Sequence, residues 1–331
     1  MVDGVKLCVV GTGYWGRNLV RNFDGLGVLE ALCEASPETA ASIANTFSEA
    51  RVLSDVGAVV ADPSLNAVAI ATPAVTHGAL VRQFLEADRH VFVEKPLCLD
   101  PREASELGDL AEARSRTLMV GHLLLYHPAF RALQSLVETG QVGQLRYIYS
   151  NRASLGKVRT EENALWSFAP HDVSMILALT GRMPERVIAS GANYLTDGVA
   201  DTTLSHLTFS HDLQAHIFVS WLHPYKEHRM VVVGSEGMIV FNDVAEGEDK
   251  LLLYPHVSKS EGGVPVINRA EAKPISYEAA EPLHLECAHF LDCVISGNRP
   301  RSDAAEGSRV LRVLKACEES ITTMTSVQIV D

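Results

Sequence analysis

The chain has 331 residues, 47% of them hydrophobic, which is enough for two domains with substantial cores. Its 28 basic and 41 acidic residues give a formal net charge of −13, and without a basic cluster this argues against binding nucleic acid or a membrane surface. The six cysteines lack CxxC spacing, and neither a signal-peptide pattern nor an apolar run of the ~20 residues of a membrane helix is present, so we expect a cytoplasmic protein.

The first predicted elements are a strand at 6–10, a glycine-rich turn and a helix. In a GxGxxG turn, the first glycine allows the tight turn, the second lets the backbone approach a pyrophosphate, and the third lets the helix pack closely. The helix start then offers free N–H groups to phosphates. The pattern predicts a dinucleotide site, and the alternative is a plain βαβ unit. The turn consists of Gly11, Thr12, Gly13, Tyr14, Trp15 and Gly16.

A second strand, 28–33, leads to Glu34, which lies 23 residues after Gly11. A carboxylate at this place can accept both hydroxyls of an adenosine ribose, and it would repel a 2′-phosphate. No arginine follows it, since the next residues are Ala35, Ser36 and Pro37. The sequence therefore favours NAD over NADP, and the alternative is a surface glutamate.

Strands and helices continue to alternate up to residue 122, with strands at 66–71, 90–93 and 118–121. This alternation predicts an α/β fold, with a doubly wound parallel sheet in a first domain at 1–122. Ligands of such sheets bind outside the carboxyl ends of the strands. We therefore expect one crevice to be bordered by Gly11, Glu34, Thr72, Glu94 and His122.

Lys95 stands between an acid and a proline at the end of the strand at 90–93. Beside a nicotinamide, burial and the positive ring would lower the pKa of this lysine, which suits it to donate to a substrate hydroxyl or to relay its proton. The alternative is a surface lysine paired with Glu94.

The pattern changes in a second predicted domain, 123–331. A strand at 145–152 and a helix ending at Gly181 are followed by strand-like alternation from 186 to about 275. This order predicts an α+β domain with a large open, mostly antiparallel sheet. Helices would cover one face and another subunit the other, so we expect a homodimer or homotetramer.

His171 lies near the start of the helix that ends at Gly181. Oxidation of an alcohol requires that the O–H proton leave, and an imidazole titrates near neutral pH. With 13 histidines in the chain, a structural role is the alternative. His206, His211 and His216 do not make a metal triad, and we expect no metal.

Several segments together resemble the Gfo/Idh/MocA oxidoreductases, a family named for glucose–fructose oxidoreductase, inositol dehydrogenase and a rhizopine-catabolism protein. The resemblance implies an NAD(P)-binding Rossmann domain and a C-terminal domain whose open sheet forms subunit contacts. The matching segments are GTGYWG at 11–16, Glu34, ATPAVTH at 71–77, EKP at 94–96, HD at 171–172, GSEG at 234–237 and FLDCVISGNRP at 290–300.

The resemblance also implies site residues. Lys95 would lie near the reacting hydroxyl, and His171 would accept its proton. The family often has an aspartate four residues before this histidine, where this chain has Ser167. Either Asp172 or another carboxylate substitutes, or catalysis is slower, or the role of His171 is altered. The implied cofactor-binding residues are those of the turn at 11–16 with Glu34, Thr72, Pro73, His77, Glu94 and Lys95.

The segments 121–130 and 154–176 resemble a subgroup associated with nucleotide-sugar metabolism. The implied reaction moves hydride between a sugar ring hydroxyl, C3 of a UDP-N-acetylhexosamine, and nicotinamide. The implied substrate-binding residues are Tyr126, Arg159, Asn163, Trp166 and Asp172. A diphosphate needs cations, for which the candidates are Lys157, Arg159, Lys226 and Arg229. The alternatives are a free-sugar or cyclitol dehydrogenase and a non-catalytic NAD-binding sensor.

Overall fold

The computed structural model describes residues 4–155, 158 and 162–329. The chain divides into two compact units, one of residues 1–126 with 280–311 and one of residues 127–279 with 312–331. The segment 280–311 therefore belongs to the first unit, whereas the sequence pattern placed it in a second domain at 123–331. The segment joins the first unit through packing between residues that are far apart in the sequence. The spacing of apolar residues along the chain does not reveal such packing.

The first unit is a six-stranded sheet in the order β3-β2-β1-β4-β5-β6, with every pair parallel. This is the doubly wound arrangement that the alternation predicted. The strands are β1 Leu7–Val10, β2 Leu29–Cys33, β3 Arg51–Leu53, β4 Ala67–Ile70, β5 His90–Glu94 and β6 Leu118–Gly121. The helices are α1 Gly16–Gly25, α2 Pro37–Thr46, α3 Val56–Ala61, α4 His77–Glu86, α5 Pro101–Ala113 and α8 Pro282–Ser296.

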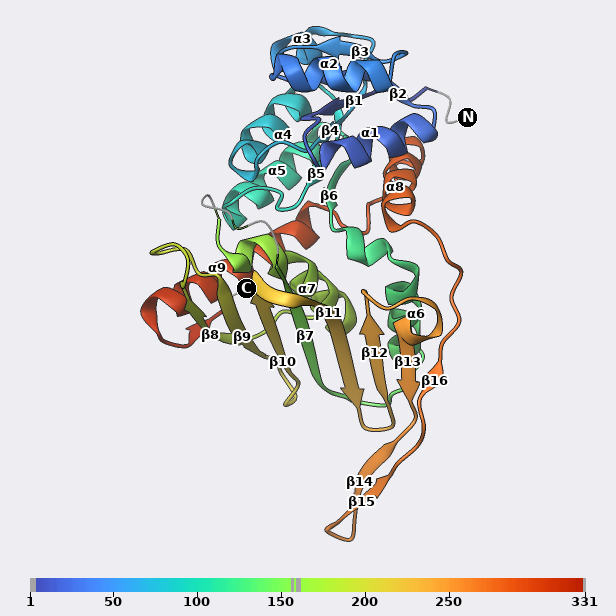
Figure 1. The fold of residues 1–331 in the computed structure, drawn as a ribbon, viewed down its shortest axis with the longest axis vertical. Helices are drawn as coiled ribbons and strands as arrows, with labels where there is room; N and C mark the ends of the chain where they lie inside the picture. The colour runs from blue at the N-terminus through green and yellow to red at the C-terminus, as the bar shows by residue number, and fades with distance from the viewer. Residues whose placement is uncertain (1–3, 156–157, 159–161, 330–331) are drawn as a thin grey trace. The chain divides into compact units, whose positions relative to one another are not determined.

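Helices cover both faces of this sheet, with α1 and α8 on one side and α4 and α5 on the other (Figure 1). Strands β1, β4 and β6 are consequently buried along their whole length, as expected for short apolar runs in a parallel sheet. Phe290 of α8 packs edge-to-face on Phe23 of α1 and Phe92 of β5, with ring centroids 6.3 and 5.9 Å apart. This aromatic cluster explains why α8 joins the first unit.

The second unit is a nine-stranded sheet in the order β16-β13-β12-β11-β7-β10-β9-β8-β17. Among the described strands of this sheet, β7 and β10 are the one pair that runs parallel, so the predicted large, mostly antiparallel sheet is confirmed. The strands are β7 Leu145–Leu155, β8 Arg186–Ala192, β9 Thr202–Thr208, β10 Gln214–Ser220, β11 Leu222–Gly234, β12 Met238–Asn242, β13 Leu251–Tyr254, β16 Lys273–Pro274 and β17 Val327–Gln328. A hairpin of β14 Val257–Glu261 and β15 Val264–Asn268 extends away from the sheet (Figure 1).

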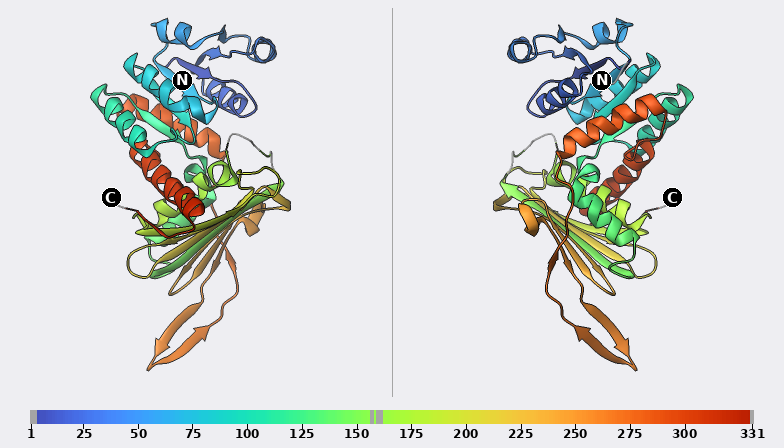
Figure 2. Two further views of the ribbon diagram at one scale, coloured as in Figure 1. Left: turned by 90° about the vertical axis from the view of Figure 1, so that its left-hand side faces the viewer. Right: turned by 90° about the vertical axis from the view of Figure 1, so that its right-hand side faces the viewer.

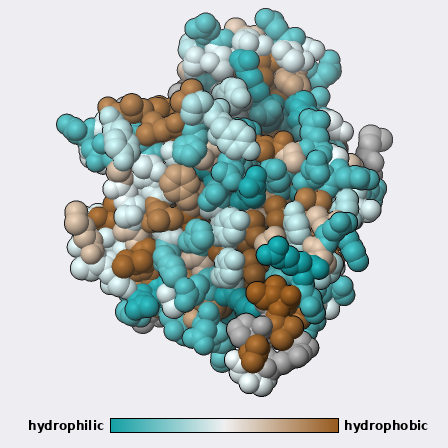
Figure 3. Space-filling model, turned by 60° about the horizontal axis from the view of Figure 1, so that its bottom comes forward, coloured by the Kyte–Doolittle hydropathy of each residue, from teal (hydrophilic) through white to brown (hydrophobic). Residues whose placement is uncertain are grey.

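One face of the large sheet is covered by α6 Pro128–Glu138, α7 Ala164–Thr180 and the later part of α9 Ala304–Thr323 (Figure 2). The opposite face carries Tyr147, Ile188 and Leu204, whose side chains are 44, 53 and 48% exposed. Apolar side chains are scattered among hydrophilic ones on the surface turned forward in Figure 3. Cover of this face by a second subunit stays a prediction. No helix among the described residues is long and apolar enough to cross a membrane.

Candidate active site

The glycine turn between β1 and α1 has the shape that a dinucleotide requires. Gly11 has a φ of +87°, and a Cβ there would lie 2.9 Å from the carbonyl oxygen of Ala71. A Cβ on Gly16 would lie 2.0 Å from the carbonyl oxygen of Gly11. A Cβ on Gly13 would meet nothing within 4 Å. Gly11 and Gly16 therefore close the turn onto β4 and α1, while Gly13 faces open space, as an approaching pyrophosphate needs.

Glu34 lies directly beside this turn. One carboxylate oxygen accepts the Thr12 backbone N–H and the Thr12 hydroxyl, both at 2.9 Å, and the other accepts the Ser36 N–H at 3.0 Å. Partial burial opposes ionisation of Glu34, but the hydrogen bonds from Ser36 and Thr12 outweigh it and lower the pKa of the carboxyl. The predicted ribose acceptor is thus an oriented anion at the carboxyl end of β2.

Replacing Glu34 with alanine should weaken NAD binding about 10- to 100-fold, because hydrogen bonds to a charged group contribute about 1.5–3 kcal/mol. The affinity for NADP should rise relative to that for NAD, since the carboxylate no longer repels the 2′-phosphate. Titration of each cofactor by calorimetry measures both. Glu38→Ala, at an exposed acid in the first turn of α2, is the control and should bind both cofactors as the parent does. Unchanged NAD affinity in the Glu34 variant would contradict the assignment.

The ends of β4 and β5 are tied together by His77. Its ring is 1% exposed, and its nitrogens lie 2.7 Å from the Pro96 carbonyl oxygen and 2.8 Å from that of Thr72. A ring nitrogen that carries a proton can donate to the carbonyl oxygen it faces, and the tautomer decides which of the two contacts is the donor. Thr72 also exchanges a hydroxyl hydrogen bond with Thr76 at 2.7 Å. His77 thereby holds the strand ends that border the predicted crevice.

Glu94 links the glycine turn to the end of β5. The Trp15 indole N–H donates to one of its carboxylate oxygens, and the Lys95 backbone N–H donates to the other at 3.3 Å. Lys95 itself is half-buried and precedes Pro96 through a cis peptide bond. Tyr14 is 95% exposed. Trp15, Glu94 and Lys95, predicted from separate segments, thus lie at one edge of the sheet.

In the second unit, His171 lies half-buried in α7, one turn after the buried Ser167. Asn163 caps this helix, accepting the backbone N–H of Trp166 at 3.1 Å. The Trp166 ring is 6% exposed, and its indole N–H donates to Glu318 at 2.8 Å. The polar groups of Asn163 and Trp166 therefore have partners inside the unit.

The remaining predicted substrate residues differ in their surroundings. Tyr126, in the first unit, is 2% exposed, and its hydroxyl lies 3.0 Å from that of Ser302. Arg159 and Lys157 lie outside the described residues. Asp172 is fully buried and forms an ion pair with Arg152 that the sequence did not indicate.

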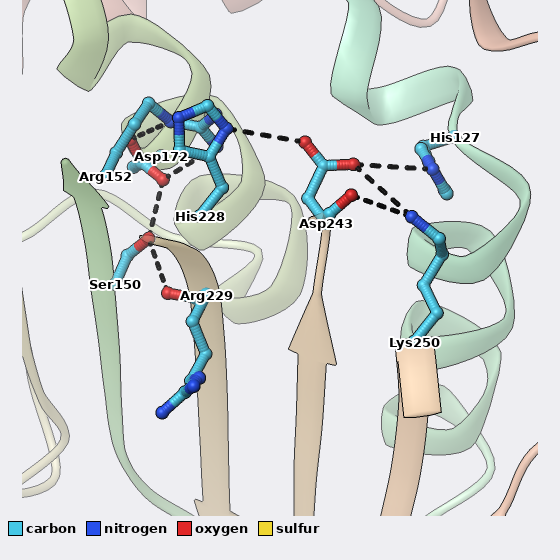
Figure 4. A network of polar contacts seen from close by, with 8 residues as sticks. All are labelled: His127, Ser150, Arg152, Asp172, His228, Arg229, Asp243 and Lys250. Carbon is cyan, nitrogen blue, oxygen red and sulfur yellow. Dashed lines mark hydrogen bonds and ion pairs between the residues drawn. The ribbon is translucent and has the colours of Figure 1, made fainter. Parts of the chain in front are cut away.

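Asp172 is the partner of Arg152 on the neighbouring strand β7 (Figure 4). The guanidinium donates to its two oxygens at 2.8 and 3.2 Å, and the Ser150 hydroxyl donates at 2.6 Å. Burial opposes the charge of Arg152, but Asp172 outweighs it and raises the pKa of the guanidinium. The pair fixes α7 on β7 next to His171. With both oxygens engaged, Asp172 is a poor substitute for the aspartate that the family often has at the position of Ser167.

The polar network continues across the sheet from Arg152 to Asp243 (Figure 4). Arg152 lies 3.3 Å from Nδ1 of His228, which lies 3.8 Å from Asp243. Asp243 is also 3.6 Å from Nε2 of His127, and its carbonyl accepts Lys250 at 2.7 Å. Burial works against ionisation of Asp243, but His228 and the nearby cations lower its pKa to about 2. Among the described residues, no three His, Cys, Asp or Glu side chains are grouped as a metal site.

Comparison with protein families agrees with this geometry. A model described as oxidoreductase family, NAD-binding Rossmann fold, matches residues 5–122, and one for the GFO/IDH/MocA C-terminal domain matches residues 130–240. The chain belongs to the Gfo/Idh/MocA family. It is therefore an oxidoreductase with an NAD-binding Rossmann domain, and the family, fold and cofactor predictions are confirmed.

Individual members of the family match almost end to end. UDP-N-acetylglucosamine 3-dehydrogenase of Acidithiobacillus ferrooxidans is 28% identical over 305 residues, covering 92% of this chain and 93% of its own. Its solved structure has a TM-score of 0.84 and covers 96% of this chain and 97% of its own. A structure from Magnetospirillum magnetotacticum is 32% identical, covers 95 and 99%, and has a TM-score of 0.83. The scyllo-inositol 2-dehydrogenase (NAD(+)) of Bacillus subtilis is 24% identical over 91% of this chain and 89% of its own.

Proposed function

We propose that the protein oxidises a ring hydroxyl, C3 of a UDP-N-acetylhexosamine, with NAD as the hydride acceptor. The observation that carries this proposal is the match along almost the whole of both chains to a UDP-N-acetylglucosamine 3-dehydrogenase. The oriented Glu34 anion and the open space at Gly13 support NAD as the cofactor.

The chemistry assigns one role to each predicted catalytic residue. Lys95 donates a hydrogen bond to the hydroxyl oxygen and polarises it, and His171 accepts the hydroxyl proton as the ketone forms. NAD, when bound, supplies the carbon that accepts the hydride. Arg159 and Lys157 are the proposed cations for the diphosphate, with Lys226 and Arg229 as further candidates. Tyr126, Trp166 and Asp172 are buried and their polar groups have partners, so the proposal gives them the role of shaping and supporting the substrate site. Asn163 caps α7 in the same supporting role.

Two further properties belong to this proposal. The half-exposed apolar residues on the open face of the large sheet support a homodimer or homotetramer. All six cysteines are buried and unpaired, which supports a reducing compartment such as the cytoplasm.

A second candidate is a cyclitol or free-sugar dehydrogenase, which the similarity to scyllo-inositol 2-dehydrogenase favours. Such an enzyme requires groups that bind hydroxyls but no cations for a diphosphate. UDP alone should therefore inhibit only if the nucleotide-sugar proposal is right. No observation favours a non-catalytic sensor.

The deciding experiment follows NADH formation with UDP-N-acetylglucosamine, myo-inositol and glucose in parallel, with 2-oxoglutarate added in a second set to reoxidise retained cofactor. We expect a signal with the UDP sugar alone, and competition by UDP. A signal confined to myo-inositol or glucose would replace the proposal with the second candidate.

A further inference from the structure

Glu286, on α8 of the first unit, is a carboxyl group that the proposed reaction does not use. Its side chain is 0% exposed, and neither carboxyl oxygen has a hydrogen-bond partner among the described residues. Burial, with Glu94 as a second cause, raises the pKa of Glu286 well above its ordinary range. An apolar residue would avoid the unfavourable burial of a partnerless acid, and such local violations are typical of functional sites.

The packing of α8 places Glu286 on the side of the sheet that carries Glu94. Side chains two apart on a strand share a face, so Phe92 and Glu94 lie on the same face of β5. The Phe290 ring packs on Phe92 at 5.9 Å, and Glu286 lies one helical turn before Phe290. Figure 1 shows α8 beside the sheet and α1. The electrostatic effect of Glu94 on Glu286 agrees with this placement.

Glu94 connects this pair of carboxyl groups to the cofactor turn. It accepts the indole N–H of Trp15, which belongs to the glycine turn at 11–16. Burial raises the pKa of Glu94, although Trp15 and Lys95 oppose the rise. Because Glu94 further raises the pKa of Glu286, the two buried carboxyl groups interact electrostatically, and we expect them to titrate as a pair.

The charged and titratable groups around the pair favour charge on Glu94 and the proton on Glu286. Lys95 and His122 favour the Glu94 anion, as does the Trp15 hydrogen bond. Around Glu286 lie two groups with raised pKa values, the Cys287 thiol and the Tyr126 phenol, each raised first by burial and further by Glu286. Glu306 is held by His122, to which it is hydrogen-bonded. Within the pair, these surroundings favour the proton on Glu286 and the charge on Glu94.

We infer that Glu286 is a positioning residue that links the charge of the cofactor to one proton: the Glu94–Glu286 pair retains this proton with NADH and releases part of it with NAD⁺. The inference rests on the NAD site proposed above. The nicotinamide ring is positive in NAD⁺ and neutral in NADH, and a nearby positive charge favours the ionised pair. Alcohol oxidation with NAD⁺ yields ketone, NADH and one proton, so the pair is a place where part of that proton is kept.

The test counts protons by calorimetry, titrating NAD⁺ and NADH in two buffers of different ionisation enthalpy. The parent should release more protons with NAD⁺ than with NADH, so the ratio of the two affinities should favour NAD⁺ more strongly as pH rises. The limit is about tenfold per pH unit for one proton. Glu286→Gln should abolish most of this difference, while Asp292→Asn, at an exposed acid of the same helix, should keep it.

A second variant and an infrared readout complete the test. Glu286→Leu should fold, with a higher Tm because the partnerless acid is gone, and it should also lose the proton difference. The carbonyl band of a protonated carboxylic acid should weaken when NAD⁺ replaces NADH in the parent alone. Equal proton counts in the parent and in both Glu286 variants would overturn the inference. If Glu34→Ala left cofactor affinity unchanged, the proposed NAD site itself would be wrong. Failure of the NAD site can therefore be distinguished from failure of the inference about Glu286.

Discussion

Replacement of Lys95 by alanine is expected to lower kcat about 10²- to 10⁴-fold, the range for a group that assists proton transfer. Lys95 is half-buried at the end of β5, where Glu94 fixes its backbone. The proposed hydrogen bond from its ammonium strengthens as the hydroxyl oxygen gains negative charge, so its loss affects the transition state more than the ground state. Steady-state NADH formation measures kcat.

NAD affinity should change little in this variant, because the glycine turn and Glu34 still hold the cofactor. Calorimetric titration checks this, and Lys6→Ala, at an exposed lysine paired with Glu30, is the control. Lys95→Arg separates two mechanisms. Arginine keeps the charge but does not give up its proton, so it retains activity if Lys95 only polarises the hydroxyl and not if Lys95 relays the proton. Full turnover of Lys95→Ala would refute both roles.

The parts of the fold that the sequence predicted correctly depend on local signals. The glycine turn at 11–16 contains its own steric reasons, since only glycine fits at Gly11 and Gly16. Alternation of apolar strands with helices sufficed for the parallel sheet.

The parts that the sequence did not predict depend on distant partners. Glu286 has the spacing of an ordinary helical acid, and only the packing of Phe290 on Phe92 shows that it is buried. Asp172 follows His171 directly, so the sequence alone indicates a carboxylate that could support this histidine. Its partners Arg152 and Ser150 come from a strand about 20 residues earlier. The sequence contains one signal of this ion pair, which is the presence of Arg152 within a strand. A central strand seldom buries an arginine without an acidic partner.

Replacement of Arg152 by leucine is expected to lower the free energy of unfolding by about 3–5 kcal/mol, the usual result of removing one partner of a buried ion pair. Asp172 is fully buried and would keep the hydrogen bond from the Ser150 hydroxyl at 2.6 Å, without a positive charge to balance its own. Urea unfolding measures the loss. Arg229→Leu is the matched control on β11, because the Arg229 guanidinium is partly exposed and pairs with Glu227 at 3.5 Å. It should lose less than about 1 kcal/mol.

The double variant Arg152→Leu with Asp172→Leu distinguishes a buried charge left alone from a simple loss of packing. Once Asp172 is also apolar, no uncompensated charge remains, so the double variant should be more stable than Arg152→Leu by about 1–4 kcal/mol. If the double variant is instead the less stable of the two, Arg152 contributes mainly through its contacts and not through the charge of Asp172. Because the pair fixes α7 on β7 beside His171, we expect kcat to fall in Arg152→Leu. In the double variant, kcat should recover only to the extent that α7 packs on β7 as it does in the parent.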